Sequence, residues 1–283
     1  MSDWLQYLYP DEAQALAEVD QWIDSGGTGA VARMLTFTHK PMEYAYQALP
    51  ESVRESINRA ISSTLHTMRD GSSVLVSRRS VLDRVASHSG QQVRGPRDLF
   101  YVSIRTLDVV ATDYLNLARA GATIGGATAG TAGVVGLVAD VPALYGILFK
   151  MIQEVAFVYG FHVKPPQEKA HILKVLDTGH YMEPEKKRRG MEELEALQDR
   201  IRQGIHTGDL DRYLLTKGLQ TIARHLSISL AERKIGQTVF LVGGVIGAGV
   251  NHQLARDVGW VAYYAYRRRF LKELALRRMA GEV

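Results

Sequence analysis

Three polar side chains, Asp140, Glu154 and Asn251, lie within strongly apolar parts of the sequence. A buried carboxylate or amide needs a partner, because leaving it unpaired costs about 1–3 kcal/mol. If the segments that carry them cross, Asp140 and Asn251 meet, and Glu154 lies about four helical turns further along its own helix. Two interpretations stay open: a hydrogen-bonded set that fixes helix register, or a ligand pocket with a shifted carboxyl pKa.

One fragment, Glu168-Lys-Ala-His171, has the spacing of a metal-ligand pair on one helix face. A carboxylate-bridged di-metal bundle needs a second such pair and two further glutamates, and no second pair is present in the sequence. We therefore interpret Glu168 and His171 as structural residues and predict neither a metal nor a cofactor. His252, next to Asn251, is interpreted as a polar contact.

The local signatures of common catalytic and nucleotide-binding sites are missing. There is no phosphate-binding loop of the Gly-x4-Gly-Lys-Ser/Thr type, and Gly247-Ala-Gly249 lacks the third glycine of a dinucleotide-binding turn. There is also no His-Glu-x2-His and no Gly-x-Ser-x-Gly sequence. Having no cysteine removes thiol nucleophiles, cysteine–zinc sites and disulfides. No catalytic residue is assigned, and an enzyme is the less favoured interpretation.

The basic residues, which give a net charge of +4, gather in two runs. Lys186 to Arg189 is surrounded by glutamates, which is typical of a solvated helix face. The second run follows an aromatic cluster, and this order is typical of a membrane interface, although the edge of a core would look similar. The membrane-interface candidates are Trp260, Tyr264, Arg267, Arg268 and Arg269. Nucleic-acid binding is disfavoured, since acids interrupt the basic runs and no recognition motif is present.

Two glycine-rich segments without charged residues, 120–139 and 235–254, are expected to organise the fold. Glycines at four-residue steps form a small-residue face that lets another helix approach closely. The packing candidates are Gly121, Gly125, Gly126, Gly130, Gly133 and Gly136, with Gly243, Gly244 and Gly247 in the second segment. The first segment is either a glycine-faced helix or hairpin within a bundle, or a membrane insertion, since twenty residues suffice to span a bilayer. We predict that the two glycine faces lie together, with Asp140 and Asn251 near their crossing.

Apolar residues recur at three- and four-residue steps along the whole chain, and no stretch alternates like a strand. The sequence therefore predicts an all-α, multi-helix bundle with the two glycine-rich apolar helices packed together. Asp140-Val-Pro142 is expected to restart the chain as an N-cap followed by a proline in the first helical turn. The other predicted helices run from Pro10 to Gly26, Pro50 to Asp70, Val74 to His88, Gly95 to Arg119, Pro165 to Thr178, Glu183 to Arg202, and from Asp209 through Leu230.

Several of these segments, in this order, resemble the EcsC family. The resemblance lies in the sequences Gly136-Leu-Val-Ala-Asp140-Val-Pro142, Glu154-Val-Ala, Tyr159-Gly160-Phe161, Lys234-Ile-Gly, Gly243-Gly-Val-Ile-Gly-Ala-Gly-Val-Asn251 and Tyr266-Arg-Arg-Arg-Phe270. One departure is Gln237-Thr-Val-Phe240, where similar proteins usually have a proline. The resemblance implies a bacterial, largely helical protein of poorly defined role, and it implies no known catalytic set. We expect amphipathic helices over 1–95 and an EcsC-like core over 96–280, joined as one domain, with a charged helical connector at about 183–206.

These features predict a non-enzymatic, membrane-associated helical protein of EcsC type, whose partner is a membrane lipid surface or a membrane protein. The chain begins with Met-Ser-Asp-Trp and no basic segment, unlike a secretory signal, so we expect it in the cytoplasm, at the inner face of the cell membrane. The alternative is a soluble helical enzyme or a carrier of a small apolar or lipid-like ligand, with a pocket around Asp140, Glu154 and Asn251. The oligomeric state stays open.

Overall fold

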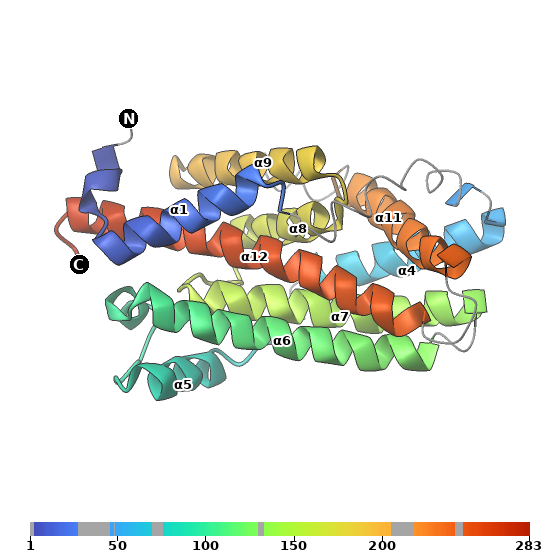
Figure 1. The fold of residues 1–283 in the computed structure, drawn as a ribbon, viewed down its shortest axis with the longest axis horizontal. Helices are drawn as coiled ribbons and strands as arrows, with labels where there is room; N and C mark the ends of the chain where they lie inside the picture. The colour runs from blue at the N-terminus through green and yellow to red at the C-terminus, as the bar shows by residue number, and fades with distance from the viewer. Residues whose placement is uncertain are drawn as a thin grey trace.

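The computed structural model describes residues 3–27, 46–47, 49–69, 76–129, 133–204, 218–240 and 246–283. Every regular element in these ranges is a helix, which confirms the predicted all-α, multi-helix class. The longer helices run along an elongated bundle (Figure 1). In chain order they are η1 (Asp3–Tyr7), α1 (Pro10–Asp24), α4 (Glu51–Arg69), α5 (Arg78–Ser89), η2 (Asp98–Tyr101), α6 (Ile104–Ala129), α7 (Gly133–Val158), α8 (Pro166–His180), α9 (Pro184–Arg202), α11 (Leu219–Phe240) and α12 (Ile246–Met279).

The bundle is built around α12, whose 34 residues span about 51 Å. α6, α7, α8 and α11 pack against it, and so do α1 and α9. Because neighbours surround it, its buried side chains do not form one narrow stripe. Its fully buried apolar residues include Leu254, Ala255, Val258, Val261, Ala262, Tyr266, Phe270 and Leu271.

The helices of the first 95 residues share this core. α1 ends where Gly26 and Gly27 take positive φ angles of 71° and 63°, a conformation that favours glycine. α4 buries Ile57, Ile61 and Leu65 against α7 and α11, as their spacing predicted. α5 begins at Arg78, four residues later than predicted, because the Ser77 hydroxyl caps it by accepting a hydrogen bond from the Ser80 amide.

The first glycine-rich segment forms the end of a helical hairpin, since α6 ends at Ala129 and α7 begins at Gly133. Gly121 and Gly125 therefore belong to one helix, while Gly133 and Gly136 belong to the next. The alternative of a single glycine-faced helix across all four positions is wrong. The end of α6 at Ala129 and the start of α7 at Gly133 divide the set.

The same hairpin corrects the expectation for Asp140 and Pro142. α7 is already helical from Gly133, and Pro142 lies inside it, so Asp140 is not an N-cap. A proline inside a helix costs about 3 kcal/mol or more, because it removes one backbone hydrogen bond and crowds the preceding turn. Leu144, Tyr145 and Leu148, all buried directly after it, show that α7 is held by tertiary packing.

α9 was expected to be a solvated connector, and for one of its faces this is wrong. Lys187, Met191 and Leu194 are buried, and α9 packs on α8 and α12. Gly190 permits this approach, because a Cβ built there would lie 2.7 Å from Cγ2 of Thr178. The many charged residues correctly predicted that the outer face of α9 is exposed to solvent. Packing against α8 buries the inner face.

Four helix ends lie together at one end of the bundle (Figure 1). They are the C-terminal ends of α6 and α11 and the N-terminal ends of α7 and α12. Both termini of the chain lie at the opposite end. Among the described residues, one helical segment, Val138–Val158, is long and apolar enough to cross a membrane. Of its apolar window, 72% is buried inside the protein, as in the core helix of a bundle.

Candidate functional site

Asp140 and Asn251 meet where α7 crosses α12, as their positions in the glycine-rich segments predicted. Nδ2 of Asn251 donates a hydrogen bond to Oδ2 of Asp140 at 2.7 Å. The two residues are only 6% and 1% exposed, so the bond joins two helices in a dry environment. The pair comes from elements 111 residues apart in sequence, and it fixes their relative register.

A second set of polar residues extends from this pair toward the surface between α6 and α12. Nη2 of Arg119 donates to Nε2 of His252 at 3.1 Å, and Nδ1 of His252 lies 3.1 Å from Oγ1 of Thr123. Since a guanidinium only donates, Nε2 of His252 accepts and Nδ1 carries the proton. Burial and the charges of Arg119 and Arg256 lower the pKa of His252, which agrees with a neutral ring.

Glu154 stands apart from the Asp140–Asn251 pair. It lies fourteen residues beyond Asp140 on α7, about 21 Å by helical rise. Its carboxylate pairs with the ammonium group of Lys150 one turn earlier, and burial raises its pKa. The three residues therefore do not line one common pocket, and their roles in binding stay a prediction.

Two of the predicted packing glycines, Gly121 and Gly125, are not points of tight approach between helices. A Cβ at Gly121 would lie 3.7 Å from Ile147, and one at Gly125 would lie 3.7 Å from Asp140, both ordinary van der Waals contacts. Tighter contacts between helices occur at Gly190, described above, at Gly259, whose Cβ would lie 2.9 Å from Leu115, and at Gly179 on α8. Gly126 is buried in α6, and Gly133, Gly136 and Gly247 have helical backbones, whereas Gly130, Gly243 and Gly244 lie outside the described residues.

Arg267 was a membrane-interface candidate, and the structure corrects this: its side chain is 1% exposed. Its guanidinium donates to Asp108 at 2.6 and 3.0 Å, to the Glu18 carboxylate at 2.7 Å and to the carbonyl oxygen of Ala15 at 3.0 Å. Asp108 also accepts a bond from the hydroxyl of Tyr159 at 2.8 Å. Burial raises the pKa of Asp108, while the charge of Arg267 opposes that rise.

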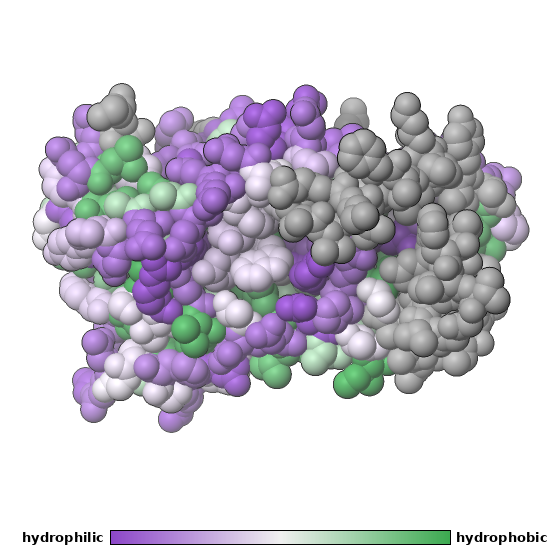
Figure 2. Space-filling model, in the orientation of Figure 1, coloured by the Kyte–Doolittle hydropathy of each residue, from purple (hydrophilic) through white to green (hydrophobic). Residues whose placement is uncertain are grey.

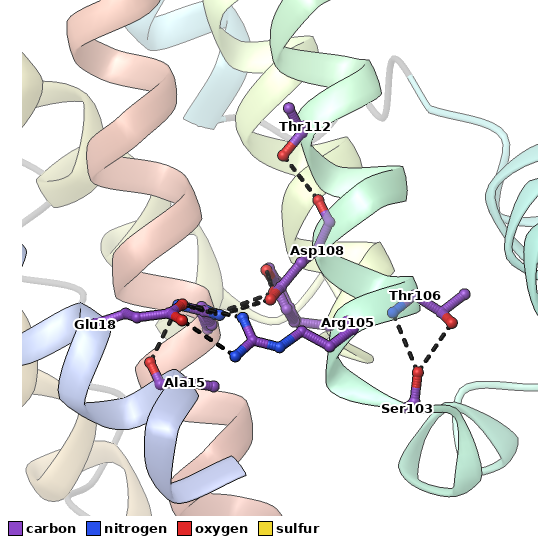
Figure 3. A network of polar contacts seen from close by, with 9 residues as sticks. Ala15, Glu18, Ser103, Arg105, Thr106, Asp108 and Thr112 are labelled. Atoms are coloured by element: carbon purple, nitrogen blue, oxygen red, sulfur yellow. Dashed lines mark hydrogen bonds and ion pairs between the residues drawn. The ribbon is translucent and has the colours of Figure 1, made fainter. Parts of the chain in front are cut away.

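Figure 3 shows how α1 and α6 bring this network together. Glu18 projects from α1 toward Arg105 on α6, and the two form a bidentate pair with both distances at 3.1 Å. Hydrogen bonds from Arg105 and Arg267 lower the pKa of Glu18 despite some desolvation. The network therefore joins α1, α6 and α12 by charge as well as by apolar contact.

The neighbouring interface candidates also have partners within the protein. Arg268 pairs with Asp20 and with Glu195, and Arg269 donates to Glu168 at 2.6 Å. Tyr264 stacks on Trp22 at a centroid distance of 4.4 Å, and Trp260 packs beside Tyr264. These arginines were expected to face lipid, but a helix surrounded by α1, α8 and α9 turns them toward carboxylates on those helices.

Glu168 and His171 are both buried on α8, and their partners support the structural interpretation. The Tyr266 hydroxyl donates to Glu168 at 2.6 Å, which leaves the glutamate bound to Tyr266 and Arg269. Nδ1 of His171 lies 3.9 Å from Glu168 and has no hydrogen-bond partner among the described residues. Burial lowers the pKa of His171 well below its usual value, so the ring is neutral.

A further polar cluster lies where α8, α9, α11 and α12 meet, and the sequence interpretation missed it. His180 donates through Nδ1 to the carbonyl of Leu176 at 2.8 Å and accepts from the Tyr145 hydroxyl at 3.0 Å. Burial lowers its pKa to about 3. The nearby Arg233 donates to Asp257 at 2.9 Å. His180 therefore acts as a neutral hydrogen-bonding group at this junction.

Lys187 is the most exceptional member of this cluster, because it is only 2% exposed. No carboxylate lies within 4 Å of its ammonium group in the described part of the chain. Burial lowers its pKa to about 8, while the charge of Asp257 opposes that effect. The basic run Lys186 to Arg189 was interpreted as solvated, and for Lys187 that is wrong.

Replacing Lys187 with methionine is expected to change how stability depends on pH. Between pH 8 and 10.5 the unfolded chain holds the lysine proton and the folded chain has lost it, so wild-type stability rises with pH there. The free energy of unfolding of the wild type minus that of the variant should increase by about 3 kcal/mol across this window. Urea unfolding at a series of pH values measures it. Lys186→Met is the control, since that side chain is 59% exposed and its difference should stay level. If the difference in the free energy of unfolding between the wild type and Lys187→Met also stayed constant with pH, that would contradict the burial of the ammonium group.

The fold and these clusters define a class of protein: an all-helical bundle whose helices are joined by buried ion pairs and hydrogen bonds. The chain belongs to the EcsC protein family, whose family model matches residues 13–271. It is similar to YdbA of Bacillus subtilis (strain 168), a protein described as uncharacterized, with 23% identity over 269 residues that cover 93% of this chain and 94% of that protein. No solved structure matches the chain.

One sequence signal could have located part of what was missed. Asp108 is a single acid directly after Leu107 and before Val109 and Val110, within an otherwise apolar pattern. An acid on a helix face that is otherwise buried needs a cation as partner. The pattern alone does not say which of the many arginines supplies it, since Arg267 lies 159 residues away.

Proposed function

We propose that this protein is a non-enzymatic, membrane-associated helical protein that contacts the bilayer with the end where its two uncharged segments meet. The single observation that supports this is that the described parts of the two uncharged segments, residues 120–129 and 133–139 of the first and 235–240 and 246–254 of the second, lie together at one end of the bundle (Figure 1). The contacts of Asp140 with Asn251 and of Thr123 with His252 join the helices that carry them. Each segment is free of Asp, Glu, Lys and Arg over twenty residues.

The exposed side of α6 extends this apolar character along the bundle. Figure 2 shows separate hydrophobic patches along the lower edge of the molecule, where Figure 1 places α6. Leu117 and Ile124 are 57% and 69% exposed on that helix. Large apolar side chains that remain in water favour transfer to a lipid phase by about 25 cal/mol per Å². α4 also reaches this end and carries Glu51 and Glu55, so the proposed contact is confined to the α6 side and the hairpin ends.

Glutamate at both positions, Leu117→Glu with Ile124→Glu, is expected to weaken vesicle binding at least about tenfold. Each substitution removes one apolar side chain from the lipid contact and adds a charge that resists burial. Flotation with phosphatidylcholine vesicles measures the bound fraction. Val109→Glu is the matched control, because Val109 is 51% exposed on the same helix but lies near its start, eight residues before Leu117 and fifteen before Ile124. A wild type that never floats, or a double variant that floats like Val109→Glu, would contradict the proposal.

A further inference from the structure

A basic cluster lies between α6 and α12, next to the proposed membrane contact. We infer that Arg119, His252 and Arg256 form a binding site for the phosphate group of an anionic lipid. His252 and Arg256 are four residues apart on α12, and so lie on one helix face. Arg119 reaches that face from α6 through its bond to His252. This inference rests on the proposed membrane association and names the lipid group that the same end of the protein binds.

The guanidinium of Arg119 lacks the carboxylate partner that the arginines of the core possess. Its contacts are Nε2 of His252 at 3.1 Å and Oδ1 of Asn116 at 3.3 Å, both uncharged groups. Within the described ranges no carboxylate lies within 4 Å of it, and its Nε–H has no acceptor. Arg267, Arg268 and Arg269 each pair with one or more carboxylates. Arg119 therefore retains a positive charge that no carboxylate within 4 Å neutralises in the described part of the chain.

Arg256 adds to the same excess of positive charge. Its Nε and Nη2 lie 3.3 and 3.1 Å from Oδ1 of Asp257, but the other oxygen of that carboxylate accepts from Arg233 at 2.9 Å. One carboxylate thus serves two guanidinium groups, and the ammonium group of Lys187 also acts on it. Arg256 keeps 34% of its side chain exposed. Burial and the charges of Arg119 and Arg256 lower the pKa of His252, so the ring between them is neutral.

The depth of the cluster suits a headgroup. Arg119 lies ten residues before Ala129, the end of α6, and Arg256 lies ten residues after Ile246, the start of α12. Each distance corresponds to about 15 Å of helix. One leaflet of bilayer hydrocarbon has about the same thickness. A hairpin end that enters one leaflet therefore places both guanidinium groups at the level of lipid phosphates, where Arg forms charge-assisted hydrogen bonds.

The test is flotation of the full chain with two kinds of vesicles, pure phosphatidylcholine and a mixture that contains phosphatidylglycerol. The wild type is expected to bind the mixed vesicles more tightly. Arg119→Gln and Arg256→Gln should each reduce that gain by about fivefold, since one basic residue near an anionic surface contributes about 1 kcal/mol. Neither should alter binding to pure phosphatidylcholine. Glutamine keeps a donor for His252 or Asp257, and Arg79→Gln, an arginine with a 92% exposed side chain on α5, is the matched control.

The outcomes separate this inference from the function on which it rests. A wild type that binds neither kind of vesicle overturns the proposed membrane association. A wild type that binds both, with the gain from phosphatidylglycerol unchanged in Arg119→Gln and Arg256→Gln, overturns the phosphate site alone. If inorganic phosphate raises the melting temperature of the wild type but not of these variants, while their vesicle binding is unchanged, the anion is a free phosphate and the lipid assignment is wrong.

Discussion

Replacing Arg267 with methionine is expected to lower the free energy of unfolding by about 3–5 kcal/mol, because it leaves the buried carboxylate of Asp108 without its cation. Methionine fills much of the same volume, so the loss reflects charge more than packing. The side chain that is removed donates to Asp108 on α6 and to Glu18 and the carbonyl of Ala15 on α1, so it joins two helices to α12. Urea unfolding followed by circular dichroism measures the loss.

Two controls separate this explanation from general damage to the core. Arg79→Met removes an arginine whose pair with Asp83 is exposed, and it should change stability by about 0.5 kcal/mol or less. Adding Asp108→Asn to Arg267→Met removes the unpaired charge and should recover part of the loss. The loss should also shrink at acid pH, where the carboxylate of Asp108 takes up a proton. An Arg267→Met variant as stable as Arg79→Met would show that the network contributes little.

Gly179→Ala is expected to lower the free energy of unfolding by about 2 kcal/mol or more, although alanine is the better helix former. The added Cβ would lie 2.6 Å from Cα and 2.7 Å from Cγ2 of Val258 on α12. A backbone atom cannot rotate away, so α8 and α12 must separate, and overpacking of this kind costs about 1–3 kcal/mol or more. Thermal and urea unfolding both measure it.

Gly146→Ala is the matched control, because it adds the same methyl group to a helix where nothing lies within 4 Å. It should raise stability by up to about 1 kcal/mol through helix propensity alone. Val258→Ala should rescue Gly179→Ala only in part, since it removes Cγ2 but leaves Cα in place. A Gly179→Ala variant that matches or exceeds the wild type would contradict the close approach of α8 and α12.

These two contacts show why sequence reasoning located the helices better than the contacts between them. Most helices were predicted from local signals. These signals are the helical periodicity of apolar residues and the residues that mark helix starts and ends, Pro10, Pro50, Pro166 and Gly90. The prediction failed at Pro142, where tertiary packing keeps a proline inside α7. The close approach of α12 at Gly179 was not predicted, because a single glycine near a helix end is a common sequence feature.

The same distinction applies to the candidate site. The sequence by itself determined that the protein is all-α, that it resembles the EcsC family, and that Asp140 and Asn251 need partners, because composition and spacing express these properties directly. Only the tertiary structure decided that Arg267 faces Asp108 and that Lys187 is buried. It also decided that Arg119 lies beside His252 without a carboxylate. The sequence does not show whether a charged side chain faces water, lipid or a distant carboxylate. That environment is set by the packing of helices that are far apart in the chain.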